Sequence, residues 1–313
     1  MPASPQAPSP PQIFDRDKLR RRRQAFARNY ADYDFLRARV SSDLETRVAD
    51  TPRIFEALLE LGGADGGLAR ALLAQNRAKS AVVSDTADLF LSAASANGLE
   101  TIFADEEALP FGTERFDLVI SPLTLHWVND LPGTLVQIRR VLKPDGLFLG
   151  ALFGAGTLAE LREVLSEAET ELTGGLSPRL SPLPGLRDMA GLLQRAGFAL
   201  PVADRDTVTV RYKTPETLLH DLKGMGERAA FVPGVTRPLP RRVLARAMDL
   251  YKERFSDPDG RVRATFEIVH LSGWAPAPGQ PQPLKPGSAK ASMADAVKRA
   301  GNSGSENAGE EKS

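Results

Sequence analysis

The sequence contains no cysteine among its 313 residues, which excludes disulfide bonds, thiolate metal sites and cysteine-ligated iron–sulfur clusters. It also has no run of about 18 apolar residues, so no transmembrane segment is expected. The first residues lack the apolar stretch of a secretory signal. Lysine plus arginine and aspartate plus glutamate both number 40, so no excess charge favours nucleic acid or an anionic membrane as a partner. We therefore expect a soluble, cytoplasmic globular protein.

The stretch from Ile54 to Leu68 indicates a ligand-binding turn. An apolar run ends at Glu60, a glycine-dense turn follows, and helical spacing begins at Leu68. A strand, a tight turn and a helix start let backbone N–H groups approach a ligand closely. Ala64 stands where a third closely spaced glycine is expected, and it adds a methyl group near the predicted ligand. The candidate binding residues of this turn are Glu60, Gly62, Gly63, Ala64 and Gly66.

Acidic residues follow the next two predicted strands. Asp85 ends the strand at 80–85, about 20 residues beyond the turn, where dinucleotide-type folds place a carboxylate that accepts hydrogen bonds from ribose hydroxyls. Alternatively, Asp85 caps the predicted helix at 87–96. Asp105 and Glu106 follow the strand at 99–104 and suit the exocyclic amine of a purine, or they belong to a solvated acidic loop.

This ordered series predicts a nucleotide-like ligand, and the short spacing of the turn favours S-adenosylmethionine over a nicotinamide cofactor. Its aminopropyl arm would lie over Gly62 to Gly66, its ribose on Asp85 and its adenine near Asp105 and Glu106.

A loop after the fourth predicted strand, at 116–121, supplies the candidates for chemistry. Ser121 and Thr124 are pocket candidates by position. His126 has a suitable unperturbed pKa to deprotonate a substrate, or it packs with Trp127 to shape the floor of the pocket. The other two histidines are expected in the core or on the surface. Because no histidine stands in a His-x-Asp or His-x-Glu pair, the residues give no positive signal for iron, and no metal site is predicted.

Strands alternate with helices at least five times, which predicts a parallel, doubly wound sheet. Two later strands, at 198–212 and 263–274, suggest an antiparallel pairing at the sheet edge. The predicted organisation is a disordered segment at 1–12, a helical extension at 13–50, the main domain at 51–274 and a disordered tail at 275–313. A basic run at 20–23 is either a solvated helix face, a contact surface for an acidic partner, or a lid over the pocket.

Several motifs resemble class I S-adenosylmethionine-dependent methyltransferases: Glu60-Leu61-Gly62, DEEALPF at 105–111, FDLV at 116–119 and LKPDG at 142–146. More narrowly, the chain is similar to bacterial relatives of the mitochondrial complex I assembly factor 5 family. That resemblance runs from about Ile13 to Trp274 and includes IFDR at 13–16, LHWVNDLP at 125–132 and LKGMGE at 222–227. It implies a Rossmann-like, seven-stranded, mostly parallel sheet with an antiparallel edge strand. It further implies S-adenosylmethionine as cofactor and a complex I subunit as protein substrate.

The resemblance implies two different reactions. The fold family transfers methyl groups, and its malonyl-carrier-protein methylating members look similar in the first half. The assembly factor family is understood to hydroxylate an arginine of a complex I subunit on the same fold. Four hypotheses therefore stay open: a protein methyltransferase, an arginine hydroxylase, a non-catalytic assembly scaffold whose basic helix is the contact surface, and a carrier-protein or small-molecule O-methyltransferase.

Overall fold

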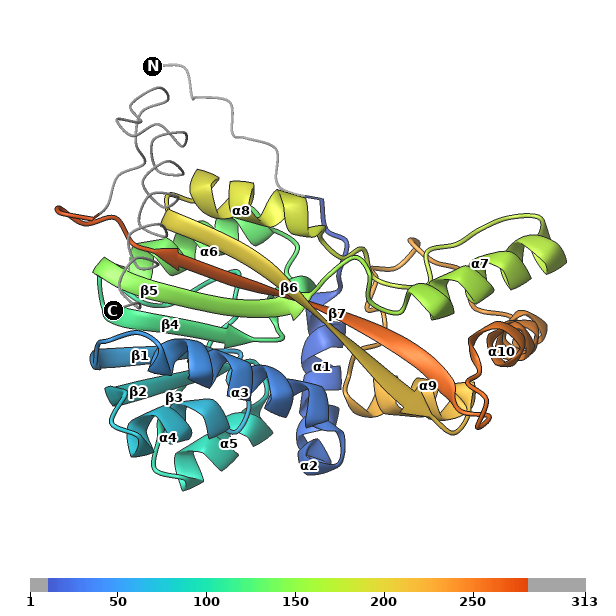
Figure 1. Ribbon diagram of the computed structural model, residues 1–313, viewed down its shortest axis with the longest axis horizontal. Helices are drawn as coiled ribbons and strands as arrows, with labels where there is room; N and C mark the ends of the chain where they lie inside the picture. The colour runs from blue at the N-terminus through green and yellow to red at the C-terminus, as the bar shows by residue number, and fades with distance from the viewer. Residues whose placement is uncertain (1–10, 281–313) are drawn as a thin grey trace, which may run out of the picture. The chain divides into compact units, whose positions relative to one another are not determined.

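A seven-stranded sheet in the order β3-β2-β1-β4-β5-β7-β6 organises residues 11–280, the part of the chain that the computed structural model describes (Figure 1). Strands β1 to β5 pair in parallel, and β7 is antiparallel to both β5 and β6. The predicted doubly wound sheet with an antiparallel edge is confirmed. The strands are β1 Phe55–Leu61, β2 Ala78–Asp85, β3 Glu100–Phe103, β4 Phe116–Pro122, β5 Leu142–Phe153, β6 Ala199–Tyr212 and β7 Val262–Trp274.

Helices cover both faces of the sheet because successive strand residues point in opposite directions. Leu58 packs with α3 and α4, whereas Leu59 packs on the other side with α6 and α8. Among the described residues, no helix is long and apolar enough to cross a membrane. The helices are α1 Arg16–Ala27, α2 Tyr30–Tyr33, α3 Phe35–Ala49, α4 Gly67–Ala74, α5 Asp88–Ala96, α6 Leu131–Val141, α7 Ala159–Thr173, α8 Leu186–Arg195, α9 Pro215–Gly224 and α10 Arg241–Phe255, with a 3₁₀ turn η1 at Leu125–Trp127.

The long β6–β7 ribbon carries the second half of the fold. Figure 1 shows α7, α9 and α10 gathered around its projecting end, away from β1, β2 and β3. The helices there begin at ordinary sequence signals: Thr214 caps α9 by accepting from the Thr217 amide, and Pro215 occupies the first helical position. This arrangement places α7 and α9 around a cavity beside the carboxyl ends of β4 and β5.

Some local expectations differ from the structure or lie beyond it. Residues 143–146, whose Lys-Pro-Asp-Gly sequence is typical of a turn, belong to β5, and Asp145 there has φ +60°. Apart from a few residues at their inner edges, the segments expected to be disordered lie outside the described residues. Compact packing extends to Pro276, and a separate unit begins at Ala277. The domain boundaries stay predictions.

Candidate functional site

The glycine turn joins β1 to α4 where the sheet order reverses, since β1 pairs with β2 on one side and β4 on the other. Gly62 has φ +63°, and a Cβ on it would lie 2.6 Å from Thr124 Cγ2. Glycine is therefore required there because the loop after β4 packs directly on the turn. A sheet order that reverses in this way creates the crevice in which open α/β proteins bind ligands.

Ala64 adopts the left-handed conformation expected of a glycine, with φ +52°. Such backbone strain in a non-glycine residue costs on the order of 1–3 kcal/mol. Its side chain is fully buried in a small cluster with Phe26 of α1, Ala87 and Phe90. The Ala64 methyl group thus packs beneath α1, which accounts for a side chain at this position.

Asp85 is fully buried at the end of β2 and joins the turn to the first helix. Its carboxylate accepts from the Ala64 amide at 2.9 Å and from the Ala87 amide at 3.0 Å. Arg23 of α1 binds both oxygens, with Nε 2.7 Å from Oδ1 and Nη2 2.5 Å from Oδ2. Burial by itself would raise the pKa of Asp85, but the Arg23 guanidinium and the two amides outweigh it and hold that pKa below its usual range.

Glu60 lies behind the turn. It is 1 % exposed, accepts from the Ala69 amide of α4 at 2.9 Å, and lies 3.7 Å from Arg37 of α3. Burial raises the pKa of Glu60 to about 7, although Arg37 and the Ala69 amide oppose this. The Gly62 carbonyl accepts from Arg37 at 2.6 Å and from Arg23 at 2.8 Å, so it too is occupied by guanidinium groups.

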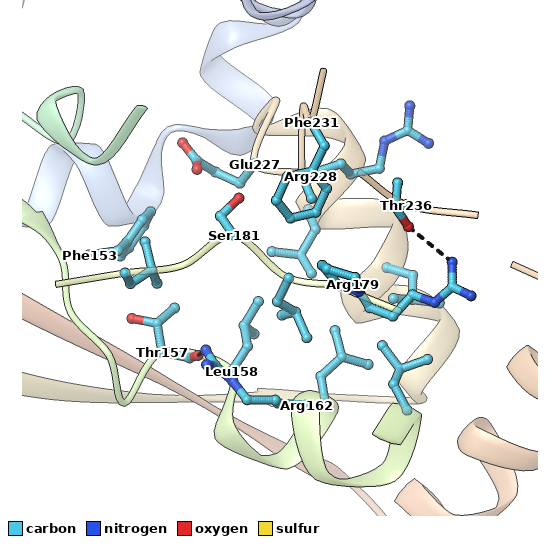
Figure 2. A pocket seen from close by; sticks show the side chains of 18 of the residues that line it. Phe153, Thr157, Leu158, Arg162, Arg179, Ser181, Glu227, Arg228, Phe231 and Thr236 are labelled. Carbon is cyan, nitrogen blue, oxygen red and sulfur yellow. Dashed lines mark hydrogen bonds between the residues drawn. The ribbon is translucent and has the colours of Figure 1, made fainter. Parts of the chain in front are cut away.

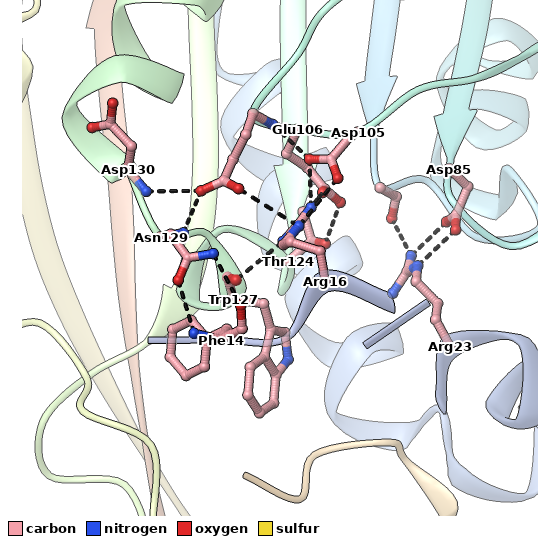
Figure 3. Close-up of polar contacts among 12 residues, drawn as sticks. Phe14, Arg16, Arg23, Asp85, Asp105, Glu106, Thr124, Trp127, Asn129 and Asp130 are labelled. Carbon is pink, nitrogen blue, oxygen red and sulfur yellow. Dashed lines mark hydrogen bonds and ion pairs between the residues drawn. The ribbon is translucent and has the colours of Figure 1, made fainter. Parts of the chain in front are cut away.

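A second guanidinium from α1 occupies the acids after β3. Arg16 donates to Asp105 Oδ1 at 2.6 Å, to Glu106 Oε2 at 2.5 Å and to the Trp127 carbonyl at 3.1 Å (Figure 3). Thr124 donates to the other Glu106 oxygen at 3.0 Å. Burial opposes ionisation, but Glu106 and Asp105 raise the pKa of Arg16 above its ordinary value.

The beginning of α1 is anchored over these acids. Asn129 Oδ1 accepts from the Ile13 and Phe14 amides, both at 2.8 Å, and the Asp15 side chain caps the helix by accepting from the Lys18 amide at 2.9 Å. Helix α1 therefore lies across the carboxyl ends of the strands, as the lid hypothesis for the basic run requires.

The space under α1 is a cavity of about 240 Å³, which we call the acidic pocket. Its polar lining combines strand-end acids with the α1 arginines that neutralise them. The lining residues are Arg16, Asp17, Leu19, Arg20, Arg23, Phe26, Thr86, Phe103, Asp105, Glu106, Thr124, Trp127, Met225, Gly226 and Glu227. The sequence interpretation missed Arg16 and Arg23 as partners of the acids. Their spacing of seven residues was an available signal, because it places both on one helix face about two turns apart.

His126 lies in the 3₁₀ turn after β4, beside the acidic pocket. Its Nε2 is 3.1 Å from Glu227 Oε2, and its ring packs against Phe153 with 4.8 Å between the centroids. Its Nδ1 is buried without a hydrogen-bond partner among the described residues. Ser121 is also fully buried, and its hydroxyl has no hydrogen-bond partner within residues 11–280. Ser121 lines neither the acidic pocket nor the larger cavity described next. The structure thus brings Asp85, Asp105 and Glu106 together under α1 but leaves Ser121 in the core.

A larger cavity of about 480 Å³, which we call the cationic cavity, lies beyond the wall formed by Trp127 and Glu227, which line both spaces. Figure 2 shows Arg162 of α7 and the preceding Leu158 on one side of it, and Arg228 and Phe231 on the other. Its charged lining residues are Arg22, Arg162, Arg179, Lys223, Glu227, Arg228 and Arg237. Within residues 11–280, no group of three or more His, Asp or Glu side chains is arranged to hold a metal ion.

Comparison with known proteins places the chain among methyltransferase-fold enzymes. The family described as "Methyltransferase domain" matches residues 59–150. The mitochondrial arginine-hydroxylase NDUFAF5 of Danio rerio is 40% identical over 300 residues, which cover 91% of this chain and 90% of that protein. A malonyl-[acyl-carrier protein] O-methyltransferase of Halorhodospira halophila is 33% identical over 282 residues, covering 88% and 92%.

Among solved structures, the YcgJ protein of Bacillus subtilis matches with a TM-score of 0.53 at 15% identity, over 74% of this chain and 97% of that one. At that identity the match supports the fold alone. Together, these findings confirm the resemblance seen in the motifs.

Proposed function

The chain belongs to the family of methyltransferase-domain enzymes that includes the arginine hydroxylase NDUFAF5 and malonyl-[acyl-carrier protein] O-methyltransferase, and from this premise we propose that it binds S-adenosylmethionine and modifies a protein. We propose a subunit of respiratory complex I as that protein, on the basis of the motifs shared with the assembly factor 5 family. The observation that carries the proposal is the buried Asp85 carboxylate beside the glycine turn, at the point where the sheet order reverses.

The hydrogen-bond acceptors around Asp85 match the donor groups of the cofactor. Asp85 would accept from the ribose hydroxyls, the Gly62 carbonyl from the ammonium group, and Asp105 and Glu106 from the adenine amine. Those same acceptors now bind Arg23 and Arg16, which are likewise cationic and rich in N–H donors. The pocket therefore selects positively charged donors, and S-adenosylmethionine is such a ligand. Its binding requires these arginines to leave the acceptors, and once bound it would supply an electrophilic methyl group.

The residues of this chain would position the substrate and take its proton. His126 and Glu227 stand at the wall between the two cavities, with Nε2 and Oε2 3.1 Å apart. We assign proton acceptance to this pair, since the carboxylate holds the imidazole in place as a general base. Such a general base contributes about 10²–10⁴-fold to a rate. Glu60 has a supporting role in this proposal, because its partners are an α4 amide and Arg37.

Titration calorimetry with S-adenosylmethionine tests the proposal. We expect saturable heat with the wild-type protein and none with Asp85→Asn. The absence of binding at millimolar cofactor would exclude a cofactor-dependent role and favour the assembly scaffold. In that case Asp85→Ala would also support normal complex I assembly in a deletion strain.

Arginine hydroxylation is the second candidate, favoured by the 40% identity to a protein of that name. Mass spectrometry of complex I subunits from wild-type and deletion strains separates the two reactions. Loss of one methyl group from a subunit in the deletion strain supports methyl transfer, and loss of one oxygen supports hydroxylation. Turnover with a malonyl carrier protein, without any subunit change, would instead favour the activity named for the 33% identical relative.

A further inference from the structure

Most cations of the cationic cavity form no ion pair within the described part of the chain. Of its cations, Arg179 pairs with Glu169. The other five form no ion pair within residues 11–280: Arg22, Arg162, Lys223, Arg228 and Arg237. The one carboxylate in the lining, Glu227, is bound to His126. This excess is local, because the whole chain has 40 basic and 40 acidic residues.

Two of these cations lie against each other. The half-buried Arg22 side chain donates to the Arg228 carbonyl. Burial and the Arg228 charge lower the pKa of Arg22, and Glu227 and Asp15 only partly oppose this. A nearby anion would relieve this repulsion, so the site favours a negatively charged ligand.

The remaining lining is mostly apolar. Leucine and phenylalanine side chains supply most of this surface, among them Leu158, Leu161, Leu165, Leu219, Phe231 and Phe266. An apolar cavity with a few polar groups at its edge binds ligands that bury apolar surface. The occupant must therefore combine an apolar body with negative charge.

The positions of the cations distinguish between kinds of anion. They come from separate segments: α1, α7, α9 and the chain between 228 and 237. Figure 2 shows Arg162 and Arg228 on different sides of the cavity. A fatty carboxylate brings one charge to one point, whereas a peptide with several acidic residues can meet cations that stand apart.

We propose that the cationic cavity binds a segment of the protein substrate in which apolar side chains enter the cavity and flanking aspartate or glutamate side chains contact Arg22, Arg228 and Arg237. This inference rests on the proposed function in one respect, namely that the substrate is a protein. The wall of His126, Trp127 and Glu227 then lies between the bound segment and the acidic pocket. Residues next to the segment would be the ones presented for modification.

Fluorescence anisotropy with defined peptides tests this inference. The probe is a short labelled peptide with a Leu-Phe-Leu centre and glutamates on both sides, compared with an analogue that has glutamines instead. We expect the glutamate peptide to bind at least about tenfold more tightly at low salt, and the difference to shrink as salt is added. Dodecanoate serves as the competitor with a single charged head.

Charge reversal identifies the residues involved. Arg228→Glu with Arg237→Glu should weaken the glutamate peptide by about tenfold or more. The matched control is Arg187→Glu with Arg195→Glu, which makes the same charge change at two exposed arginines of α8 that also lack ion pairs within the described residues. All four positions are exposed, so folding should be preserved, and circular dichroism checks this. Arg162→Glu provides a second variant on the other side of the cavity.

Equal binding of both peptides, no binding of either, or equal loss in the control variant would overturn the inference. Dodecanoate binding that depends on Arg228 and Arg237, without peptide binding, would also overturn it and identify an acyl ligand. The peptide titrations are run without S-adenosylmethionine and repeated in Asp85→Asn. Because these titrations need no cofactor, peptide binding can be observed even if S-adenosylmethionine does not bind. The two proposals can therefore fail separately.

Discussion

The acidic pocket and the cationic cavity share a wall but differ in how their charges are neutralised. In the acidic pocket, Asp105 and Glu106 pair with Arg16, and the lining residue Arg23 pairs with Asp85, which is buried behind the lining. In the cationic cavity, five cations lack an ion pair with any described carboxylate. The acids at the acidic pocket are thus already bound by arginines of the chain itself. Those five arginine and lysine side chains of the cationic cavity are available to bind an anionic ligand.

The difference shows what α1 does in this fold. Arg16 and Arg23 stand seven residues apart on one face of α1, so they reach the ends of the neighbouring strands β3 and β2. The contact of α1 with the acidic pocket is therefore electrostatic and lies within the chain, and the proposed cofactor would compete with it. The cationic cavity has no such internal competitor among the described residues, so its ligand should bind without displacing an ion pair.

The largest effect is expected from Asp85→Asn. The Arg23 side chain is only 17% exposed, and removing its carboxylate leaves a mostly buried charge unpaired. Breaking a buried pair in this way costs on the order of 3–5 kcal/mol, and the free energy of unfolding in urea should fall by an amount near the lower end. Calorimetry should detect no S-adenosylmethionine binding.

A double variant separates the loss of stability from the loss of cofactor binding in Asp85→Asn. Adding Arg23→Gln to Asp85→Asn removes the unpaired charge, so most of the lost stability should return while cofactor binding stays absent. If the double variant is as unstable as the sum of the single variants, the pair does not account for the position of α1.

The next largest effect is expected at Glu60. Unlike the acids that pair with Arg16 and Arg23, Glu60 is a buried carboxyl group behind the glycine turn. Burial raises the pKa of Glu60 to about 7 from an ordinary 4.5. The folded state therefore holds this proton more tightly than the unfolded state. The resulting stability is fully present below about pH 4.5 and is lost as the pH rises through about 7. A shift of that size corresponds to about 3 kcal/mol.

Glu60→Gln should remove this part of the pH dependence. Urea unfolding of both proteins across the interval between the two pKa values measures it, and the wild type should show the steeper fall in stability as pH rises. Identical slopes would mean that Glu60 is ionised throughout in the folded protein. Asp85 does not confuse the measurement, because its lowered pKa places its own contribution at more acidic pH.

The sequence predicted much of this architecture but less of the site. Buried strands such as β4 are nearly continuous apolar runs, and their alternation with helices indicates a parallel, doubly wound sheet. The strand-end acids were also found, because Asp85 and Asp105 each follow such a run. Their partners were missed because Arg16 and Arg23 read equally well as a solvated basic face until α1 is placed on the sheet. Only tertiary packing decides between those interpretations.

Other features had no local signal. Glu227 lies 101 residues from His126, and no spacing rule connects them. Glu60 was expected to face the ligand, and its partners in α3 and α4 depend on how those helices pack. The cationic cavity is assembled from segments whose individual arginines are unremarkable in sequence. Ala64 was recognised as unusual, but the Phe26 and Phe90 rings that cover its methyl group were not.

A smaller effect on cofactor affinity is expected from Arg23→Gln, which removes the competitor and keeps Asp85, although it leaves that buried carboxylate unpaired and so lowers the free energy of unfolding as Asp85→Asn does. The affinity for S-adenosylmethionine should rise about tenfold, equivalent to about 1.4 kcal/mol, because the cofactor no longer displaces an ion pair. Arg39→Gln is the matched control, since Arg39 pairs with Asp206 at 2.8 Å on an exposed surface. That control should leave calorimetric affinity unchanged. Weaker binding in Arg23→Gln would show that Arg23 contacts the cofactor directly.

The smallest effect should come from Arg228→Gln in the cationic cavity. The Arg228 charge lowers the pKa of the neighbouring Arg22, so its removal relieves repulsion without breaking an ion pair in the described residues. The free energy of unfolding should stay the same or rise by a few tenths of a kcal/mol, as is typical of exposed charges. Urea denaturation at low and high salt measures this, and salt should shrink the gain because it screens the repulsion. A clear loss of stability would mean that Arg228 has a carboxylate partner in solution. The contrast between a neutralised pocket and an unneutralised cavity would then no longer hold.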